Sequence, residues 1–287
     1  MIINNAQQDE RPSEAERELL RRAGFRSILV APMLWQDHLV GTLSVLSRHE
    51  AAFGPRDAQF VTAVATQVTA IVRMAMLLEE LQSVSSSLAL SHEETVMLLA
   101  SSAEAHDRTI GVHFQNVRWL AEALARELGY TGEASRELGL AAALHDIGKI
   151  RVPEEILVKS GELSAKEWEV IKHHTLWGEQ FLNGRRGFEL AAVIARSHHE
   201  RWDGAGYPDG LAGEAIPDAA AIVSVADSFD AMTSHRSYSA SQSIEAAVAD
   251  IVACSYKQFS PRVAEALVRL HERGGLPLAT TLEQAAA

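Results

Sequence analysis

Histidine and aspartate residues in the middle of the chain form the sequence feature with the clearest chemistry. The dipeptide His145-Asp146 precedes a second group, His198-His199-Glu200, which leads into a glycine-rich turn containing Gly206-Tyr207-Pro208. Eight of the chain's 12 histidines lie between residues 106 and 235. Imidazole suits iron, zinc, copper and nickel, whereas carboxylates suit magnesium and manganese, so a mixed set favours iron or manganese. These residues predict hydrolytic chemistry at a metal centre with nitrogen and oxygen ligands.

Helical phase separates the inward-facing histidines from those that face solvent. On an expected helix over residues 111–128, His113 shares one face with the apolar residues that follow it. On an expected helix over residues 164–182, His174 falls on the apolar face, while His173 points to the opposite side. We therefore predict His113 and His174 as metal ligands and expect His173 in solvent.

Two further expected helices end in potential ligands. A helix from Glu137 reaches His145-Asp146, and Gly148 is a natural residue to terminate it. A helix from Glu189 brings His198-His199 to its end, with the first of the pair on the inner face. Side chains at the end of a helix can converge on one site because the backbone is about to turn.

An aspartate on a later expected helix completes the set. Asp227 follows Val223 by one helical turn, and Asp230 lies on the same face. A buried carboxylate is costly unless it is paired or bound to a metal, which favours Asp227 as a ligand. The predicted metal ligands are His113, His145, Asp146, His174, His198, His199 and Asp227. Seven side chains exceed the needs of one ion, so we predict two ions bridged by Asp146.

Composition limits the classes of function that are open to this chain. With 287 residues, 47% hydrophobic and 22% charged, it is expected to form one or two globular domains. The net charge of -12 argues against binding nucleic-acid polymers or an anionic membrane. No uncharged apolar run approaches the roughly 18 residues of a membrane span. The only cysteine, Cys254, cannot form an internal disulfide, so a cytoplasmic location is expected.

The first 50 residues differ in texture from the rest of the chain. Two short apolar runs over residues 27–33 and 38–46 flank Trp35-Gln36-Asp37 and predict a β-hairpin. A long helix is expected from Gly54-Pro55 onward. Within it, apolar residues follow alternating spacings of four and three, the pattern of a coiled-coil seam. The seam residues are Phe60, Val64, Gln67, Ile71, Met74, Leu78 and Leu81.

Two explanations of this seam are open. It covers the preceding sheet, or it pairs with a second copy of the chain in a parallel homodimer. Residues 13–82 resemble the C-terminal half of a GAF domain, with two strands and the segment "AFGPRDAQF" at the entry to a long helix. The earlier strands of that family are absent, so an intact small-molecule sensor is not expected.

Residues 95–272 resemble an HD-GYP phosphodiesterase. The motifs that carry the resemblance are "HDIGKIRVPEEIL", "IKHHTLWGEQFL", "HHERWDGAGYPDGLAGEAIP" and "VADSFDAMTS", in that order. The resemblance implies a mainly α protein, in which a small partial α/β GAF-like domain and a long linking helix precede an all-helical HD-type domain. The corresponding parts are residues 1–55 (GAF-like), 56–94 (linking helix), 95–275 (HD-GYP domain) and 276–287 (tail).

The resemblance also implies a reaction. It is the hydrolysis of cyclic di-GMP to linear pGpG or to GMP, with iron or manganese ions held by the seven ligands and a bridging hydroxide as nucleophile. Asp146 and Lys149 would be the catalytic residues. Lys149 and Arg236 would contact the phosphates, and the loop Gly206-Tyr207-Pro208 would line the substrate pocket.

The chain departs from the family pattern at several positions. Thr109 replaces a glutamate that holds a third ion in some members, which favours two ions here. His106-Asp107 stands where Arg-Asp is usual. After Arg236 the chain has Ser237 and Ser239 in place of a proline and a basic residue, so one phosphate contact is missing.

These departures keep two alternatives open. The first is a receptor without catalytic activity, which binds cyclic di-GMP or a signalling partner protein and acts through the long helix. The second is a metal-dependent phosphohydrolase of another nucleotide, since HD-type sites cleave several phosphoesters.

Overall fold

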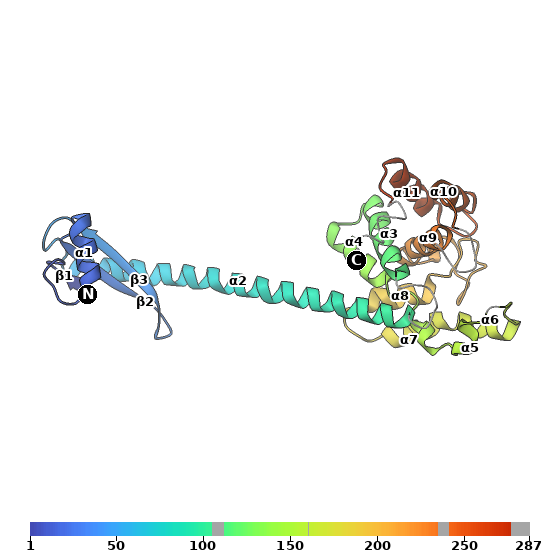
Figure 1. The fold of residues 1–287 in the computed structure, drawn as a ribbon, viewed down its shortest axis with the longest axis horizontal. Helices are drawn as coiled ribbons and strands as arrows, with labels where there is room; N and C mark the ends of the chain where they lie inside the picture. Colours follow the sequence, from blue (N-terminus) through green and yellow to red (C-terminus); the bar gives the residue numbers. More distant parts are fainter. Residues whose placement is uncertain (105–111, 160, 235–240, 277–287) are drawn as a thin grey trace. The chain divides into compact units, whose positions relative to one another are not determined.

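A computed structural model describes residues 1–104, 112–159, 161–234 and 241–276 of the chain. The chain divides into two compact units, Met1–Ala89 and Leu90–Ala287. The first holds the only sheet among the described residues, and the second is helical (Figure 1). The predicted mainly α class with a small α/β part at the N-terminus is therefore confirmed.

The first unit is built on a three-stranded antiparallel sheet. Its strands β1 (Ile2–Ile3), β2 (Ser27–Trp35) and β3 (His38–Ser47) lie in that order. Gln36 and Asp37 join the last two strands with φ angles of 47° and 65°. Positive φ at both central residues is typical of the tight turns that close hairpins. The predicted hairpin is confirmed.

Helices cover the two faces of this sheet. Helix α1 (Glu14–Ala23) begins with a capping box between Ser13 and Glu16, and its Leu20 is buried with Ile28 on one face. Helix α2 (Pro55–Glu104) buries Val61 and Ala65, among others, against the opposite face. Because successive strand residues alternate in direction, one short strand supplies both of these small cores.

The predicted seam lies on a different side of α2 from the residues that cover the sheet. Its exposed members are Phe60, Gln67, Ile71, Met74, Leu78 and Leu81, and Val64 alone is half-buried. The explanation that the seam covers the sheet is therefore wrong. Val61 and Ala65 do this instead, because each lies next to a seam position and is rotated by about 100° around the helix.

Helix α2 is also long and apolar enough to cross a membrane. Over its most apolar 18-residue window the mean hydropathy is 1.7, and 17% of that window is buried. It is the one helix among the described residues with this property. We predicted that no uncharged apolar run reaches the length of a membrane span. Helix α2 reaches that length when a window with one or two charged residues is allowed.

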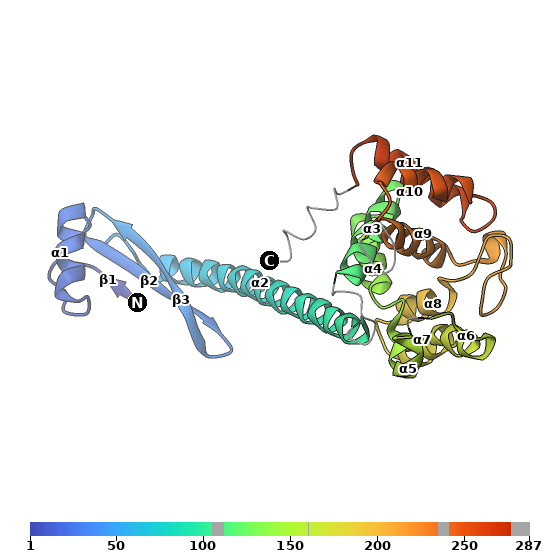
Figure 2. The same cartoon turned by 45° about the vertical axis from the view of Figure 1, so that its right-hand side comes forward.

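The second unit packs its helices around one apolar core. Helix α3 lies against α4 and α9, and α8 lies against α4, α7 and α9 (Figure 2). The last residues of α2, including Val96 and Ala100, belong to the same core. The elements are α3 (His113–Glu127), α4 (Gly132–Ala142), η1 (Ile147–Arg151), α5 (Glu154–Leu157), α6 (Ala165–Lys172), α7 (His174–Leu182), α8 (Glu189–Ser197), η2 (Gly213–Ala215), α9 (Asp218–Thr233), α10 (Ile244–Ala253) and α11 (Pro261–Glu272).

One predicted helix starts and ends earlier than expected. Helix α4 begins at Gly132, where the Thr131 hydroxyl accepts the Ala134 N–H at 3.3 Å. It ends at Ala142, so His145-Asp146 lie in the turn that follows the helix rather than at its end. Contrary to our prediction, Gly148 does not terminate an α-helix but lies within the short helix η1. Glycine is required there because the backbone of η1 packs closely against α7.

The expected helix over residues 164–182 is two helices, with a break at His173. At the break, side chains make hydrogen bonds to backbone carbonyls that would accept backbone N–H groups in a continuous helix. The His173 and His174 rings bond the carbonyls of Glu169 and Ile171 at 2.7 and 2.6 Å. The Thr175 hydroxyl donates to the Lys172 carbonyl at 2.9 Å. Such local side-chain bonds compete with the helical ladder.

Candidate metal centre

Two groups of potential ligands share Asp146. The first, which we name the His174 cluster, consists of Asp146, His174, His198 and His199. The second, the His113 cluster, consists of His113, His145 and Asp146. In each cluster the ligand atoms lie within 4.8 Å of one another. The structure thus brings together six of the seven predicted ligands, and Asp227 lies beside the second cluster.

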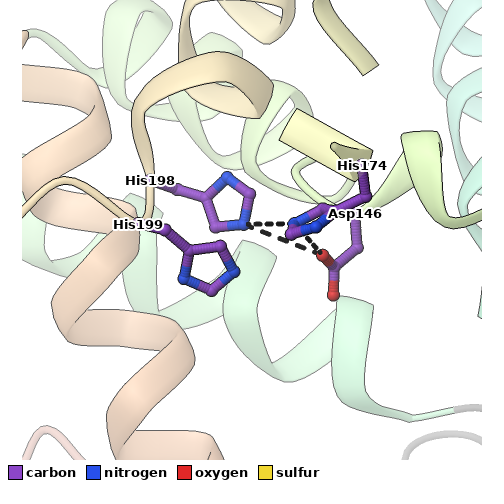
Figure 3. A group of neighbouring side chains, drawn as sticks. All are labelled: Asp146, His174, His198 and His199. Atoms are coloured by element: carbon purple, nitrogen blue, oxygen red, sulfur yellow. Dashed lines mark hydrogen bonds and ion pairs between the residues drawn. The ribbon is translucent and has the colours of Figure 1, made fainter. Parts of the chain in front are cut away.

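In the His174 cluster, two imidazoles and one carboxylate point toward a common centre (Figure 3). His174 Nε2 lies 3.5 Å from His198 Nε2 and 3.3 Å from Asp146 Oδ1. His198 Nε2 lies 3.7 Å from the same carboxylate oxygen. Ligand atoms at about 2.0–2.2 Å from one ion lie roughly 3–3.5 Å from each other. These spacings suit a shared ion.

Close backbone packing positions these ligands. A Cβ atom added to Gly148 would lie 1.9 Å from the His174 carbonyl oxygen and 2.5 Å from the Gly178 nitrogen. One added to Gly178 would lie 3.0 Å from the Cβ of Ala195 on α8. Only glycine lets η1, α7 and α8 approach so closely. This approach brings Asp146 to the histidines of the other two elements.

Hydrogen bonds select the ring nitrogen that each histidine offers to an ion. His145 Nδ1 lies 2.9 Å from the Ala142 carbonyl oxygen, and His174 Nδ1 lies 2.6 Å from that of Ile171. His198 Nδ1 lies 3.1 Å from carbonyl oxygens of its own helix. A carbonyl only accepts, so Nδ1 carries a hydrogen, and Nε2 is the nitrogen left to bind an ion. Metal-binding histidines are commonly oriented in this way.

The His113 cluster is organised by carboxylates of α9. Asp227 Oδ1 lies 3.4 Å from His113 Nε2 and 4.0 Å from His145 Nε2. Asp230 Oδ2 lies 2.6 Å from His113 Nδ1, and Asp230 Oδ1 accepts the Asn116 amide N–H at 2.7 Å. Asp230 therefore orients His113 and leaves its Nε2 facing Asp227.

The clusters differ in their electrostatics. Burial lowers the pKa of His174 to about 4, and burial also lowers the pKa of His199 well below its usual value. Burial works in the same direction on His145, but the Asp146 and Asp227 carboxylates outweigh it and raise the pKa of His145 to about 9. A positive charge is thus favoured on His145 of the His113 cluster, whereas the neutral imidazole is favoured at His174 and His199 of the other cluster.

The donor set fits metal binding. His145 Nε2 and Asp146 Oδ1 are buried and have no hydrogen-bond partner within the described ranges. Buried polar atoms without a partner are costly. An ion in the His113 cluster would satisfy His145 Nε2, and an ion in the His174 cluster would satisfy Asp146 Oδ1. Imidazoles together with carboxylates suit iron, manganese or zinc. The chain's one cysteine, Cys254, lies at the end of α10 and belongs to neither cluster, so no thiolate ligand is present.

Lys149 places a positive charge beside the shared carboxylate. Its Nζ lies 2.8 Å from Asp146 Oδ2. Burial works against ionisation of Asp146, but Lys149 and His145 hold the pKa of that carboxyl well below its usual range. Asp146 is therefore ionised and able to bridge two ions.

The glycine-rich loop closes over the His174 cluster. The Tyr207 ring lies 4.9 Å from the His199 ring between centroids, with 31° between their planes. A Cβ added to Gly206 would lie 2.4 Å from the Arg201 nitrogen, so the loop folds tightly on itself. The predicted substrate residues Gly206, Tyr207 and Pro208 thus adjoin the site.

Several residues that position the site carry little sequence signal. Glu200 is buried, and its carboxylate accepts the backbone N–H groups of Asp209 and Leu211 at 2.8 and 3.0 Å. Glu200 was not among the predicted site residues, and its contacts are to backbone groups of the loop that follows it. The sequence did not indicate roles for Asn116 and Glu104. Asn116 bonds Asp230, far away in the sequence, and Glu104 bonds a backbone N–H of a different helix.

Other predicted residues cannot be placed. Arg236, Ser237 and Ser239 lie outside the described residues, and so do Thr109 and His106-Asp107. The predicted phosphate contact of Arg236 stays a prediction, as does the missing contact at Ser239. His173 is exposed, away from both clusters.

Comparison with known proteins places the site in a family. Residues 84–263 match the HD domain family, and residues 1–72 match the GAF domain family. A cyclic di-GMP phosphodiesterase of Thermotoga maritima is 42% identical over 181 residues, 62% of this chain and 49% of that protein. The cyclic di-GMP phosphodiesterase response regulator RpfG of Xanthomonas campestris is 42% identical over 178 residues, 61% of this chain and 47% of that protein.

A third relative has a different substrate in its name. The 3'3'-cGAMP-specific phosphodiesterase 2 of Vibrio cholerae is 38% identical over 178 residues, 61% of this chain and 34% of that protein. The chain spans half or less of the length of these three relatives. The chain is a member of the HD domain family; its motifs resemble those of the HD-GYP type, and its first 72 residues match the GAF domain family.

Proposed function

We propose that this protein is a metal-dependent phosphodiesterase that hydrolyses a cyclic dinucleotide, with cyclic di-GMP as substrate and linear pGpG or GMP as product. The observation that carries the proposal is the pair of ligand clusters that share Asp146, with Lys149 Nζ 2.8 Å from that carboxylate. The relatives support the class of reaction, because each is named as a phosphodiesterase of a cyclic dinucleotide.

Bound iron or manganese ions would activate water and neutralise charge on the phosphate. The chain's own residues provide the rest. Asp146 offers one carboxylate oxygen to each cluster, and His145, His174 and His198 present Nε2 toward them. Lys149 is placed to stabilise charge that develops on the non-bridging phosphate oxygens. No side chain is required as a covalent nucleophile.

The loop beside the His174 cluster would form one wall of the substrate pocket. Tyr207 is half-buried, and burial raises the pKa of its hydroxyl, so the phenol stays protonated and can donate a hydrogen bond to a phosphate or sugar oxygen. Gly206 and Pro208 would shape this wall, and Arg236 is the second phosphate contact in the proposal.

A chromatographic turnover assay tests the proposal. The full chain is prepared without oxygen, loaded with Fe(II) or Mn(II), and supplied with cyclic di-GMP, 3'3'-cGAMP or a deoxynucleotide. Formation of pGpG or GMP from cyclic di-GMP is the expected result. Preferred cleavage of 3'3'-cGAMP would move the substrate to that of the Vibrio relative. Cleavage of the deoxynucleotide alone would favour a general phosphohydrolase, and tight binding without turnover would favour a receptor.

The exposed face of α2 would join two copies of the chain in a parallel homodimer. Its apolar residues repeat every 3.5 positions, the period that keeps two identical helices in contact. They include Phe60, Ile71 and Leu81, all more than half exposed. A dimer in light scattering that becomes a monomer in Ile71→Glu is expected. Flotation of the chain with lipid vesicles would instead assign this face to a membrane and contradict the cytoplasmic, membrane-free location that we propose.

A further inference from the structure

Glu104, the last residue of α2, lies at the start of the helix that carries His113. It is buried, and its Oε1 atom accepts the Phe114 N–H at 2.7 Å. Phe114 directly follows His113 in the first turn of α3. A carboxylate from a different helix thus contacts the backbone next to a predicted metal ligand.

This bond replaces a missing helix cap. The N-cap of α3, Val112, has an apolar side chain and makes no cap hydrogen bond with it. The first-turn N–H groups of a helix need acceptors from elsewhere, and an anionic acceptor is favoured at this end. Glu104, which lies nine residues before His113 in the sequence, supplies such an acceptor to the Phe114 N–H.

Two contacts therefore hold His113 from different sides. Asp230 of α9 fixes its ring through Nδ1 at 2.6 Å, and Glu104 of α2 fixes its backbone through the neighbouring N–H. Rotation or translation of the first turn of α3 would move Nε2 away from Asp227, which lies 3.4 Å from it. Both contacts are needed for a defined position of the ring.

The second carboxylate oxygen of Glu104 is also buried. This atom, Oε2, has no hydrogen-bond partner in the part of the chain that the structure describes. Burial raises the pKa of this carboxyl, and the charges of His113 and His145 oppose that shift, so the group lies within electrostatic range of the His113 cluster. A carboxyl so costly to bury needs a role that offsets the cost.

We propose that Glu104 is a positioning residue for the metal ion of the His113 cluster, acting through the backbone of α3 and not as a ligand. The inference rests on the proposed metal centre. It differs from the orientation of His113 by Asp230, because it makes the end of α2 part of the apparatus that sets metal affinity. A displacement of that helix end would therefore change occupancy of one cluster and leave the other filled.

The test measures Mn(II) bound per full-length chain, by equilibrium dialysis and elemental analysis, in three variants. Glu104→Ala removes the acceptor and is expected to weaken one of the two ions by roughly 10–100-fold, the usual effect of losing a residue that orients a ligand. Glu104→Gln keeps an oxygen that can accept the Phe114 N–H and is expected to retain both ions. Circular dichroism verifies that each variant is folded.

Glu93→Ala is the matched control. Glu93 also lies on α2 and pairs with Arg118 of α3, so its loss weakens the contact between the same two helices away from the first turn. We expect it to bind both ions normally. Unchanged affinity in Glu104→Ala, equal losses in Glu93→Ala, or a Glu104→Gln variant as defective as Glu104→Ala would overturn the proposal. Metal content is measured without substrate. Absence of turnover in the wild-type chain would therefore refute the proposed function but not the role proposed for Glu104.

Discussion

The two clusters that share Asp146 are assembled by different means. In the His174 cluster, ligands from η1, α7 and α8 meet because three backbones touch at Gly148 and Gly178. In the His113 cluster, His145 and Asp146 come from the turn after α4, and His113 of α3 is held by side chains, chiefly Asp230 and Glu104. One half of the site is held by backbone packing, and the other by hydrogen bonds between helices distant in sequence.

This difference has consequences for how each half responds to change. Backbone contacts between glycines leave little room for adjustment, since a well-packed interior does not yield gradually. Hydrogen-bonded carboxylates can be removed singly while the fold persists, at the cost of the ligand they orient. We therefore expect the His113 cluster to lose its ion more readily. The His174 cluster should lose its ion only when a ligand itself is removed or the local fold is disrupted.

The largest effect is expected for Asp146→Ala, because this carboxylate serves both clusters. Both ions should be lost together, and turnover should fall by on the order of 10³-fold or more. Elemental analysis and the turnover assay measure the two effects. The control is His173→Ala, which removes an exposed neighbour of His174 and should change neither. Retention of one tightly held ion in Asp146→Ala would show that the clusters are independent.

Gly148→Ala should damage the backbone-built half. The added Cβ would lie 1.9 Å from the His174 carbonyl oxygen, a contact that no side-chain movement can relieve. We expect a loss of about 3 kcal/mol or more in the free energy of unfolding, at the upper end for overpacking, together with loss of metal from the His174 cluster. Denaturant titration measures the stability.

Gly132→Ala is the matched control for this substitution. Nothing lies within 4 Å of a Cβ at Gly132, which occupies the start of α4. Replacement of glycine by alanine in such a place should change stability by less than about 1 kcal/mol. Equal stability of the two variants would contradict the close approach of η1 to α7.

Asp230→Ala should weaken only the hydrogen-bonded half. Without Asp230 the His113 ring loses its Nδ1 partner, and affinity for one ion should fall by roughly 10–100-fold while the second stays bound. Mn(II) titration of the variant measures both affinities. Asp218→Ala, at the exposed start of the same helix, should have no effect. Equal weakening of both ions would show that the halves are mechanically coupled.

The smallest effect is expected outside both clusters, at the capping box of α6. The Lys159 ammonium and the Ser164 hydroxyl and N–H lower the pKa of Glu167 to about 2. A depressed pKa means that the ionised form stabilises the fold above the unfolded value of about 4.5, and that this contribution is lost as the pH falls toward 2. Glu167→Gln should reduce the pH dependence of the thermal midpoint in that window. An unchanged dependence would refute the assignment.

Local periodicity explains which parts of this protein were predictable. Helical phase predicted that His113 and His174 face inward, because the face of a residue depends only on its neighbours in sequence. The hairpin between β2 and β3 was equally local. The break at His173 was missed because it arises from side-chain bonds to carbonyls, which periodicity does not register.

From the amino-acid sequence we could predict the mainly helical class, the family and the six residues that form the two clusters. The fold was needed to show how these residues divide between two clusters and that Asp230 orients His113 while Asp227 faces its Nε2. It was also needed to show that the apolar seam of α2 is exposed. The physical reason is that ligand type and helical phase are encoded locally. Distances between side chains, in contrast, depend on packing among elements that are far apart along the chain.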